Sequence, residues 1–147
     1  MMSPVTATRP AARRWPGSVG ALLAGFIAVV VLSIGTDIGL RETSIFPPLG
    51  QPMSDALFLL ATIYRTVYAV AGSYITARLA PIRPMLHALL GGALGLVLST
   101  VGAVSRWNRG AEFGPHWYPL ALVATAMPCA WLGGKLRVMQ LRRVRLS

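Results

Sequence analysis

Four apolar stretches divide this 147-residue chain, and most of its charged residues fall in the gaps between them. The stretches run over 18–40, 54–80, 85–104 and 115–136. About 20 apolar residues in a helix cross the roughly 30 Å of hydrocarbon in a bilayer, and helices satisfy their own backbone hydrogen bonds there. A chain with 54% hydrophobic and 12% charged residues also departs from the composition of soluble domains. The pattern predicts an all-α polytopic membrane protein, a four-transmembrane-helix antiparallel bundle over 18–136.

The positions of the basic residues predict the orientation of the bundle. With both termini inside, ten of the fourteen Lys and Arg residues are cytoplasmic, three are outside, and Arg65 lies within a span. An excess of Lys and Arg marks the cytoplasmic side, so we expect an N-in/C-in protein. Residues 1–17 are expected to form a disordered basic cytoplasmic tail, and 137–147 a basic juxtamembrane cytoplasmic tail.

Basic residues at the cytoplasmic boundary are expected to bind lipid headgroups. Anionic lipid attracts each Lys or Arg near the surface by about 1 kcal/mol. The predicted headgroup-binding residues are Arg78, Arg83, Lys135, Arg137, Arg142 and Arg143. Because the net charge of +10 is distributed along the membrane boundary, the expected partner is a bilayer with anionic lipid on its cytoplasmic side, and no nucleic acid.

Arg65 is the charge that most needs an explanation. It follows Asp55 by ten residues, about 15 Å along a helix axis, which places it near the bilayer midplane. An unpaired arginine there costs from about 3 to more than 10 kcal/mol. Helical side chains point toward the amino terminus of their helix, so Arg65 leans outward and Asp37 leans inward. The predicted intramembrane polar cluster comprises Arg65, Asp37, Thr62, Thr66 and Tyr68, with Tyr64 as a further hydroxyl.

Two interpretations of this cluster stay open. The favoured one is a buried ion pair that fixes the register of two helices. The alternative is a transport site, and an anion or an amphipathic acid suits it because the only midplane charge is positive.

Small residues recur along the second and third spans. His87, Gly91, Gly95, Ser99 and Ala103 are spaced four apart, and Gly72 belongs to a small, polar stripe on the second span. Small residues at this spacing allow close approach of helix backbones in lipid. The predicted helix-packing residues are Gly72, Gly91, Gly95 and Ser99. They would pack within the chain or between copies in a homo-oligomer, and Gly95→Leu is expected to disrupt that packing.

No group of residues indicates catalysis. The chain has no glycine-rich phosphate loop, no metal-ligand spacing, and no nucleophile with a base and an orienting acid; its single cysteine is Cys129. We therefore expect no enzyme activity, no metal and no cofactor. The favoured function is a non-enzymatic accessory or interaction subunit that packs with itself or with a larger membrane complex through its small-residue helix faces. The alternative is a small transporter or channel for an anionic or amphipathic solute, with Arg65 in the bundle core.

Two runs of sequence carry a family resemblance. GSYITARLAPIRPMLHALLGG and HWYPLALVATAMPCAWLGGKLR resemble segments of small, uncharacterised four-span bacterial inner-membrane proteins. The resemblance covers about Tyr64 to Arg137. It implies a multi-pass protein of the bacterial inner (plasma) membrane, and it supplies no activity or catalytic residue.

Overall fold

The structure is a computed structural model that describes residues 15–110 and 113–146. These residues form four helices and no strand: α1 (Trp15–Glu42), α2 (Asp55–Leu79), α3 (Pro84–Arg106) and α4 (Trp117–Leu146). The prediction of an all-α helical bundle is thus confirmed. Residues 1–14 of the predicted amino-terminal tail lie outside the described residues, whereas 15–17 belong to α1. The predicted carboxy-terminal tail from 137 onward continues α4 as far as Leu146.

Three of the helices, α1, α2 and α3, are long and apolar enough to cross a membrane. The chain is therefore a multi-pass membrane protein. Helix α4 forms where a fourth span was expected, but it does not reach the same apolar content. Pro119, Pro128 and three aromatic residues dilute its first half, and basic residues occupy its second half. A fourth span stays a prediction.

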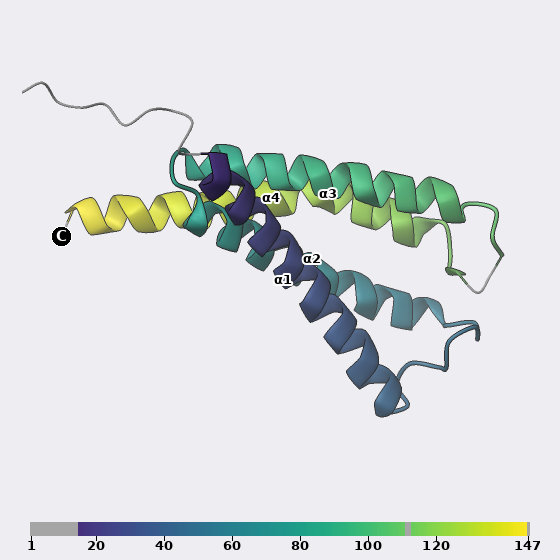
Figure 1. Cartoon of the computed structure of the whole chain (residues 1–147). Helices are drawn as coiled ribbons and strands as arrows, with labels where there is room; N and C mark the ends of the chain where they lie inside the picture. The colour runs from purple at the N-terminus through teal and green to yellow at the C-terminus, as the bar shows by residue number, and fades with distance from the viewer. Residues whose placement is uncertain (1–14, 111–112, 147) are drawn as a thin grey trace, which may run out of the picture.

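The helices associate as two crossing pairs (Figure 1). Helices α3 and α4 run side by side, α1 packs on α2, and α2 also packs against α4. Helix α1 lies near α3 at the end where α1 begins and diverges from it toward the opposite end. The two ends differ in their connections, because a short turn links α2 to α3 whereas longer loops precede α2 and α4.

The turn between α2 and α3 is closed by local backbone geometry. Arg83 adopts the left-handed conformation with φ of 46°, and Pro84 then occupies the first turn of α3, where its fixed φ suits a helix and its missing N–H is not needed. The backbone N–H of His87 donates to the Arg83 carbonyl, and the His87 ring nitrogen Nδ1 lies 3.3 Å from the same oxygen. These contacts fold α3 directly back along α2.

Glycines set the closest helix crossings. At Gly72 of α2, an added Cβ would meet the Val29 side chain of α1 and lie 2.8 Å from the Gly25 carbonyl oxygen. At Gly133 of α4, it would lie 2.6 Å from the Val70 carbonyl oxygen of α2. Small residues at these positions let the backbones touch, which supplies van der Waals contact where lipid offers no hydrophobic driving force.

A small aromatic core lies at the end of the bundle opposite the turn between α2 and α3. Phe46, Phe58, Ala61 and Tyr118 are buried together. The Phe58 and Tyr118 ring centroids are 5.0 Å apart, at a tilted geometry that aromatic pairs favour. This core fixes the start of α4 against α2 and ties the first long loop to both.

Gly72→Ala is expected to lower the free energy of unfolding by about 1–3 kcal/mol, because the new methyl group must displace the α1 backbone or Val29. Thermal unfolding followed by circular dichroism in detergent measures the change. Gly95→Ala is the matched control, since nothing lies within 4 Å of a Cβ at Gly95. Equal stability of the two variants would contradict the close α1–α2 crossing.

Candidate functional site

An ion pair joins α1 and α2 inside the bundle. Nη2 of Arg65 lies 2.6 Å from Oδ2 of Asp37, and the Tyr64 hydroxyl donates a hydrogen bond to the other carboxylate oxygen. The structure thus brings together the two charges that side-chain direction predicted. The Arg65 and Asp37 side chains are 30% and 25% exposed, so neither is sealed inside protein.

The other residues of the predicted polar cluster make different bonds. The hydroxyls of Thr62 and Thr66 donate to carbonyl oxygens one turn earlier in α2, at 2.9 and 2.7 Å. The Tyr68 hydroxyl is 2.8 Å from that of Thr36, beside Asp37 on α1. These bonds satisfy the hydroxyls within and between α1 and α2, and none of them reaches Arg65.

Tyr118 is a neighbour of Arg65 that the sequence reasoning missed. Cζ of Arg65 lies 6.0 Å from the Tyr118 ring centroid, at the outer limit for a cation–π contact. In the sequence, Tyr118 stands near the start of the apolar stretch 115–136, and its approach to Arg65 depends on how α4 packs on α2. Nε of Arg65 is buried and has no hydrogen-bond partner among the described residues.

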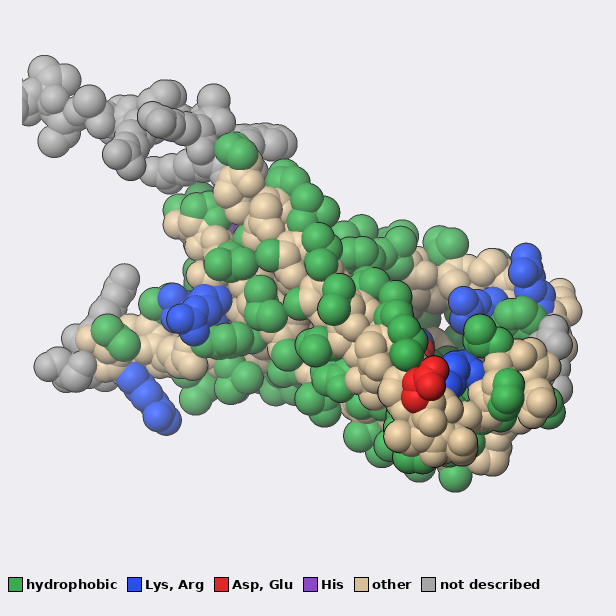
Figure 2. All heavy atoms as spheres, turned by 60° about the horizontal axis from the view of Figure 1, so that its bottom comes forward, with side chains coloured by type: hydrophobic (Ala, Val, Ile, Leu, Met, Phe, Trp, Pro, Cys, Tyr) green, Lys and Arg blue, Asp and Glu red, His purple; other side chains and the backbone are tan. Residues whose placement is uncertain are grey.

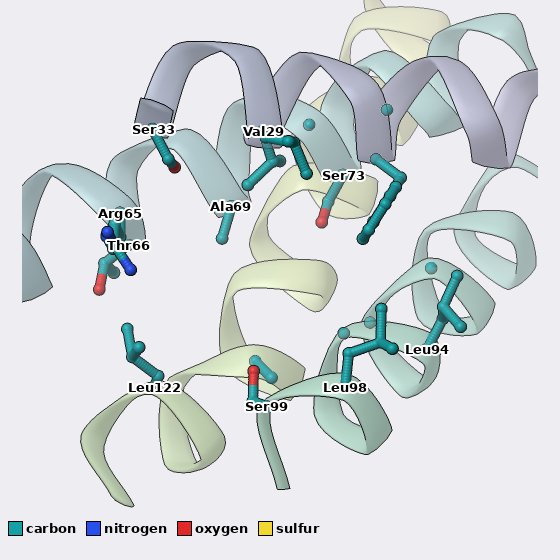
Figure 3. Close-up of a pocket in the computed structure, with 18 of the residues that line it drawn as sticks. Val29, Ser33, Arg65, Thr66, Ala69, Ser73, Leu94, Leu98, Ser99 and Leu122 are labelled. Carbon is teal, nitrogen blue, oxygen red and sulfur yellow. The ribbon is translucent and has the colours of Figure 1, made fainter. Parts of the chain in front are cut away.

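A cavity of about 380 Å³ lies between the four helices, and we call it the chamber. It extends along α1 from Leu22 to Asp37, and its walls are mostly aliphatic. Hydroxyls of Ser33, Ser73 and Ser99, one each from α1, α2 and α3, point into it, and Arg65 stands at one side (Figure 3). The chamber therefore combines an apolar wall with a few polar groups, as ligand sites do.

A second cavity of about 530 Å³, the vestibule, lies under the loop between α3 and α4. Its walls include Arg106 from the end of α3 and His116 from the loop. Arg65, Ser99 and Leu122 line both the vestibule and the chamber. Figure 2 shows basic and acidic side chains gathered at this end of the molecule, beyond a belt that is almost free of charge.

The predicted helix-packing residues do not all lie between helices. Gly72 faces α1, and Gly91 lies near Leu22 of α1, 3.6 Å from an added Cβ. Gly72 and Gly91 also line the chamber, and so do Gly95 and Ser99. The four-residue spacing puts them on one face of α3, but α1 and α2 diverge from that face at their depth. A Cβ at Gly95 would meet no atom within 4 Å, and the disruption expected of Gly95→Leu, within the chain or between copies, stays a prediction.

The predicted headgroup residues lie at the opposite end from the vestibule. Arg78, Arg83, Lys135, Arg142 and Arg143 are exposed, and Arg137 is half-buried. Arg78 lies 3.5 Å from the Tyr74 hydroxyl, which donates to Gln140 at 2.7 Å and so ties α2 to α4. Their role in lipid binding stays a prediction.

The part of the chain that the structure describes holds no group of three or more His, Cys, Asp or Glu residues placed to bind a metal. Cys129 is buried, with its sulfur 3.7 Å from the Thr66 carbonyl oxygen. It packs as a small side chain between α4 and α2.

The fold and this site define a multi-pass helical membrane protein with a charged pair exposed to internal cavities. Comparison of the chain with protein-family models, curated proteins and solved structures gave no match. The functional argument therefore depends on the geometry of the site.

Arg65→Leu is expected to lower the free energy of unfolding by about 3 kcal/mol, because it leaves the Asp37 charge without its partner. The double variant Asp37→Leu/Arg65→Leu removes both charges and is expected to recover to within about 1 kcal/mol of the unmodified protein. Unfolding of both single variants and the double variant completes the cycle. Additive losses would show that the two residues do not interact.

Proposed function

We propose that the protein is a small transporter or channel in which Arg65 binds an anionic or amphipathic solute. The observation that carries this proposal is the position of Arg65 in the wall shared by the vestibule and the chamber. A charge inside a membrane protein is expected to face protein or water rather than lipid, and an arginine that lines two cavities can also meet a solute there. Here both partners retain exposed surface, and Arg65 presents part of it to the two cavities.

We further propose four spans in a bacterial inner membrane, with both termini in the cytoplasm. The pairing of α4 with membrane-length α3 supports the fourth span: a Cβ at Gly92 would meet Ala130, and one at Gly134 would lie 2.9 Å from Ala88. The cluster of basic residues at the end opposite the vestibule supports the orientation. The vestibule then faces the outer side, and solute enters from there.

The role we propose is non-enzymatic. The cavity walls present an arginine, hydroxyls and aliphatic side chains, which hold a solute by charge, hydrogen bonds and burial. Arg65 stays protonated in a protein and cannot exchange protons with a bound molecule.

Uptake into proteoliposomes tests the proposal, with p-toluenesulfonate as a small amphipathic anion that stays charged at neutral pH. The unmodified protein is expected to admit it above the rate of empty liposomes. The double variant Asp37→Leu/Arg65→Leu is expected to fold and to lose at least about nine-tenths of that uptake, because a charged contact of 1.5–3 kcal/mol is gone. Uptake equal to that of the unmodified protein would contradict a role for Arg65.

A second candidate is the accessory or interaction subunit, and one observation favours it. Gly35 and Gly39 are exposed on α1, four residues apart, and nothing lies within 4 Å of a Cβ at either. Such a pair allows close approach of a helix from another chain, whether a second copy or a larger membrane complex.

Native mass spectrometry of protein extracted from its own membrane tests this candidate. An accessory subunit is expected to retain a partner, and Gly35→Leu to release it. Gly20→Leu, at another open position of α1, is the matched control and should leave the complex intact. A monomer in the unmodified protein would contradict the accessory role.

A further inference from the structure

We infer that the solute is a single-chain amphiphile with an acidic headgroup, held with its headgroup in the vestibule between Arg65 and Arg106 and its chain in the chamber. This inference rests on the proposed function and names the class of solute. Arg106 then becomes a residue that determines specificity.

The vestibule favours an anion. Arg65 and Arg106 line it, together with His116, and no acidic side chain lines it among the described residues; Glu112 of the same loop lies outside them. Asp37 lines the chamber but not the vestibule. A headgroup on the vestibule side therefore meets Arg65 away from the competing carboxylate.

Arg106 is available to such a headgroup. Its guanidinium carbon lies 6.0 Å from the Phe113 ring centroid, and it makes no ion pair within the part of the chain that the structure describes. The part of the vestibule wall next to Arg106 is held in place by two contacts. Nε2 of His116 is 3.0 Å from the Trp107 carbonyl oxygen, and the His116 and Trp107 rings stack with their centroids 4.6 Å apart. Two arginines facing one cavity bind carboxylate or phosphate oxygens through charge-assisted hydrogen bonds.

The chamber favours a hydrocarbon chain. Phe26 of α1 and Leu94 and Leu98 of α3 line it. The same three side chains are 42%, 44% and 45% exposed, so the chamber is open on the side between α1 and α3. Those helices diverge there (Figure 1), and a chain can enter from the bilayer without crossing water.

The two cavities adjoin at Arg65, Ser99 and Leu122, which line both, and the inferred ligand passes between these side chains. Figure 3 shows Arg65 at the left of the chamber and Leu122 and Ser99 along its lower edge. A molecule that occupies both cavities must therefore be charged at one end and apolar along the rest. A small inorganic anion leaves the aliphatic walls unused, and an uncharged hydrophobe leaves both arginines without a partner.

Binding of radiolabelled dodecanoate to the full chain in nanodiscs tests the inference, with empty nanodiscs as the background. Dodecanoate is expected to bind at least about tenfold more tightly than 1-dodecanol, which has the same chain without the charge. Lauroyl-lysophosphatidylglycerol distinguishes the source of the acid: tighter binding of this lipid than of dodecanoate identifies a membrane lipid, and the reverse identifies a free acid.

Two matched pairs of variants locate the ligand. Arg106→Gln is expected to weaken dodecanoate binding about tenfold, whereas Arg109→Gln, three residues further on in the loop and outside both cavities, leaves it unchanged. Gly95→Leu inserts a side chain into the chamber and is expected to weaken binding as well. Its control is Ala93→Leu, at an exposed position of α3 that lines neither cavity.

Photolabelling with a fatty acid that carries a diazirine at the chain end identifies the residues that contact the end of the bound chain. Labels are expected on chamber residues such as Phe26 and Leu94, and Gly95→Leu should suppress them. Labels confined to the bilayer-facing side chains Val31, Val67 and Val101, with no effect of Gly95→Leu, would overturn the inference.

The outcomes separate the two proposals. Uptake of p-toluenesulfonate that depends on Arg65, with dodecanoate bound no better than 1-dodecanol, would overturn the amphiphile and leave the transporter. If p-toluenesulfonate uptake does not depend on Arg65 and dodecanoate binds no better than 1-dodecanol, both proposals are overturned. Dodecanoate binding that Arg106→Gln and Arg109→Gln weaken equally would overturn the role of Arg106.

Discussion

The cost of an arginine in the middle of a membrane helix governs how this bundle is assembled. Arg65 needs a counter-charge, and Asp37 near the end of α1 supplies it. Along α1, Asp37 is about 18 Å from the Gly25 crossing, whereas Arg65 is about 10 Å from Gly72 on α2. The long arginine side chain spans the offset by extending toward the amino terminus of α2. The glycine crossing and the ion pair thus fix α1 against α2 at two depths.

Small residues have opposite effects at different depths of the same bundle. At Gly72 and Gly133 the neighbouring backbone fills the space that a missing side chain leaves, and the helices touch. At Gly95 no neighbour follows, because α1 has already diverged from α3, and the same lack of a side chain leaves a cavity. The aromatic core around Phe58 and Tyr118 keeps α2 and α4 together beyond this depth. The chamber lies between the glycine crossings and this aromatic core, the two regions where the helices are held together.

Sequence reasoning succeeded where one helix or one distance decides the outcome. Apolar length predicted the helices, and side-chain direction predicted the approach of Arg65 and Asp37. It missed what depends on crossing geometry: spacing places Gly95 on a face of α3 without saying what that face meets, and Tyr118 reaches Arg65 only through the α2–α4 packing. Thr62 and Thr66 were grouped with the arginine in the predicted cluster, and their hydroxyls donate to carbonyl oxygens one turn earlier in α2. The apolar content of α4 was overestimated, since its prolines and aromatic rings dilute the aliphatic residues.

The ion pair also sets a condition on binding under the proposed function. An anion that approaches Arg65 competes with Asp37 for the same guanidinium, and the net gain is the difference between the two contacts. The Tyr64 hydroxyl bonds to Asp37 and can hold that carboxylate when a ligand shares the arginine. Arg65 has five N–H donors in a planar fork, so it can contact a carboxylate on each side at once. Binding then requires no separation of the pair, and the register of α1 and α2 is preserved while the site is occupied.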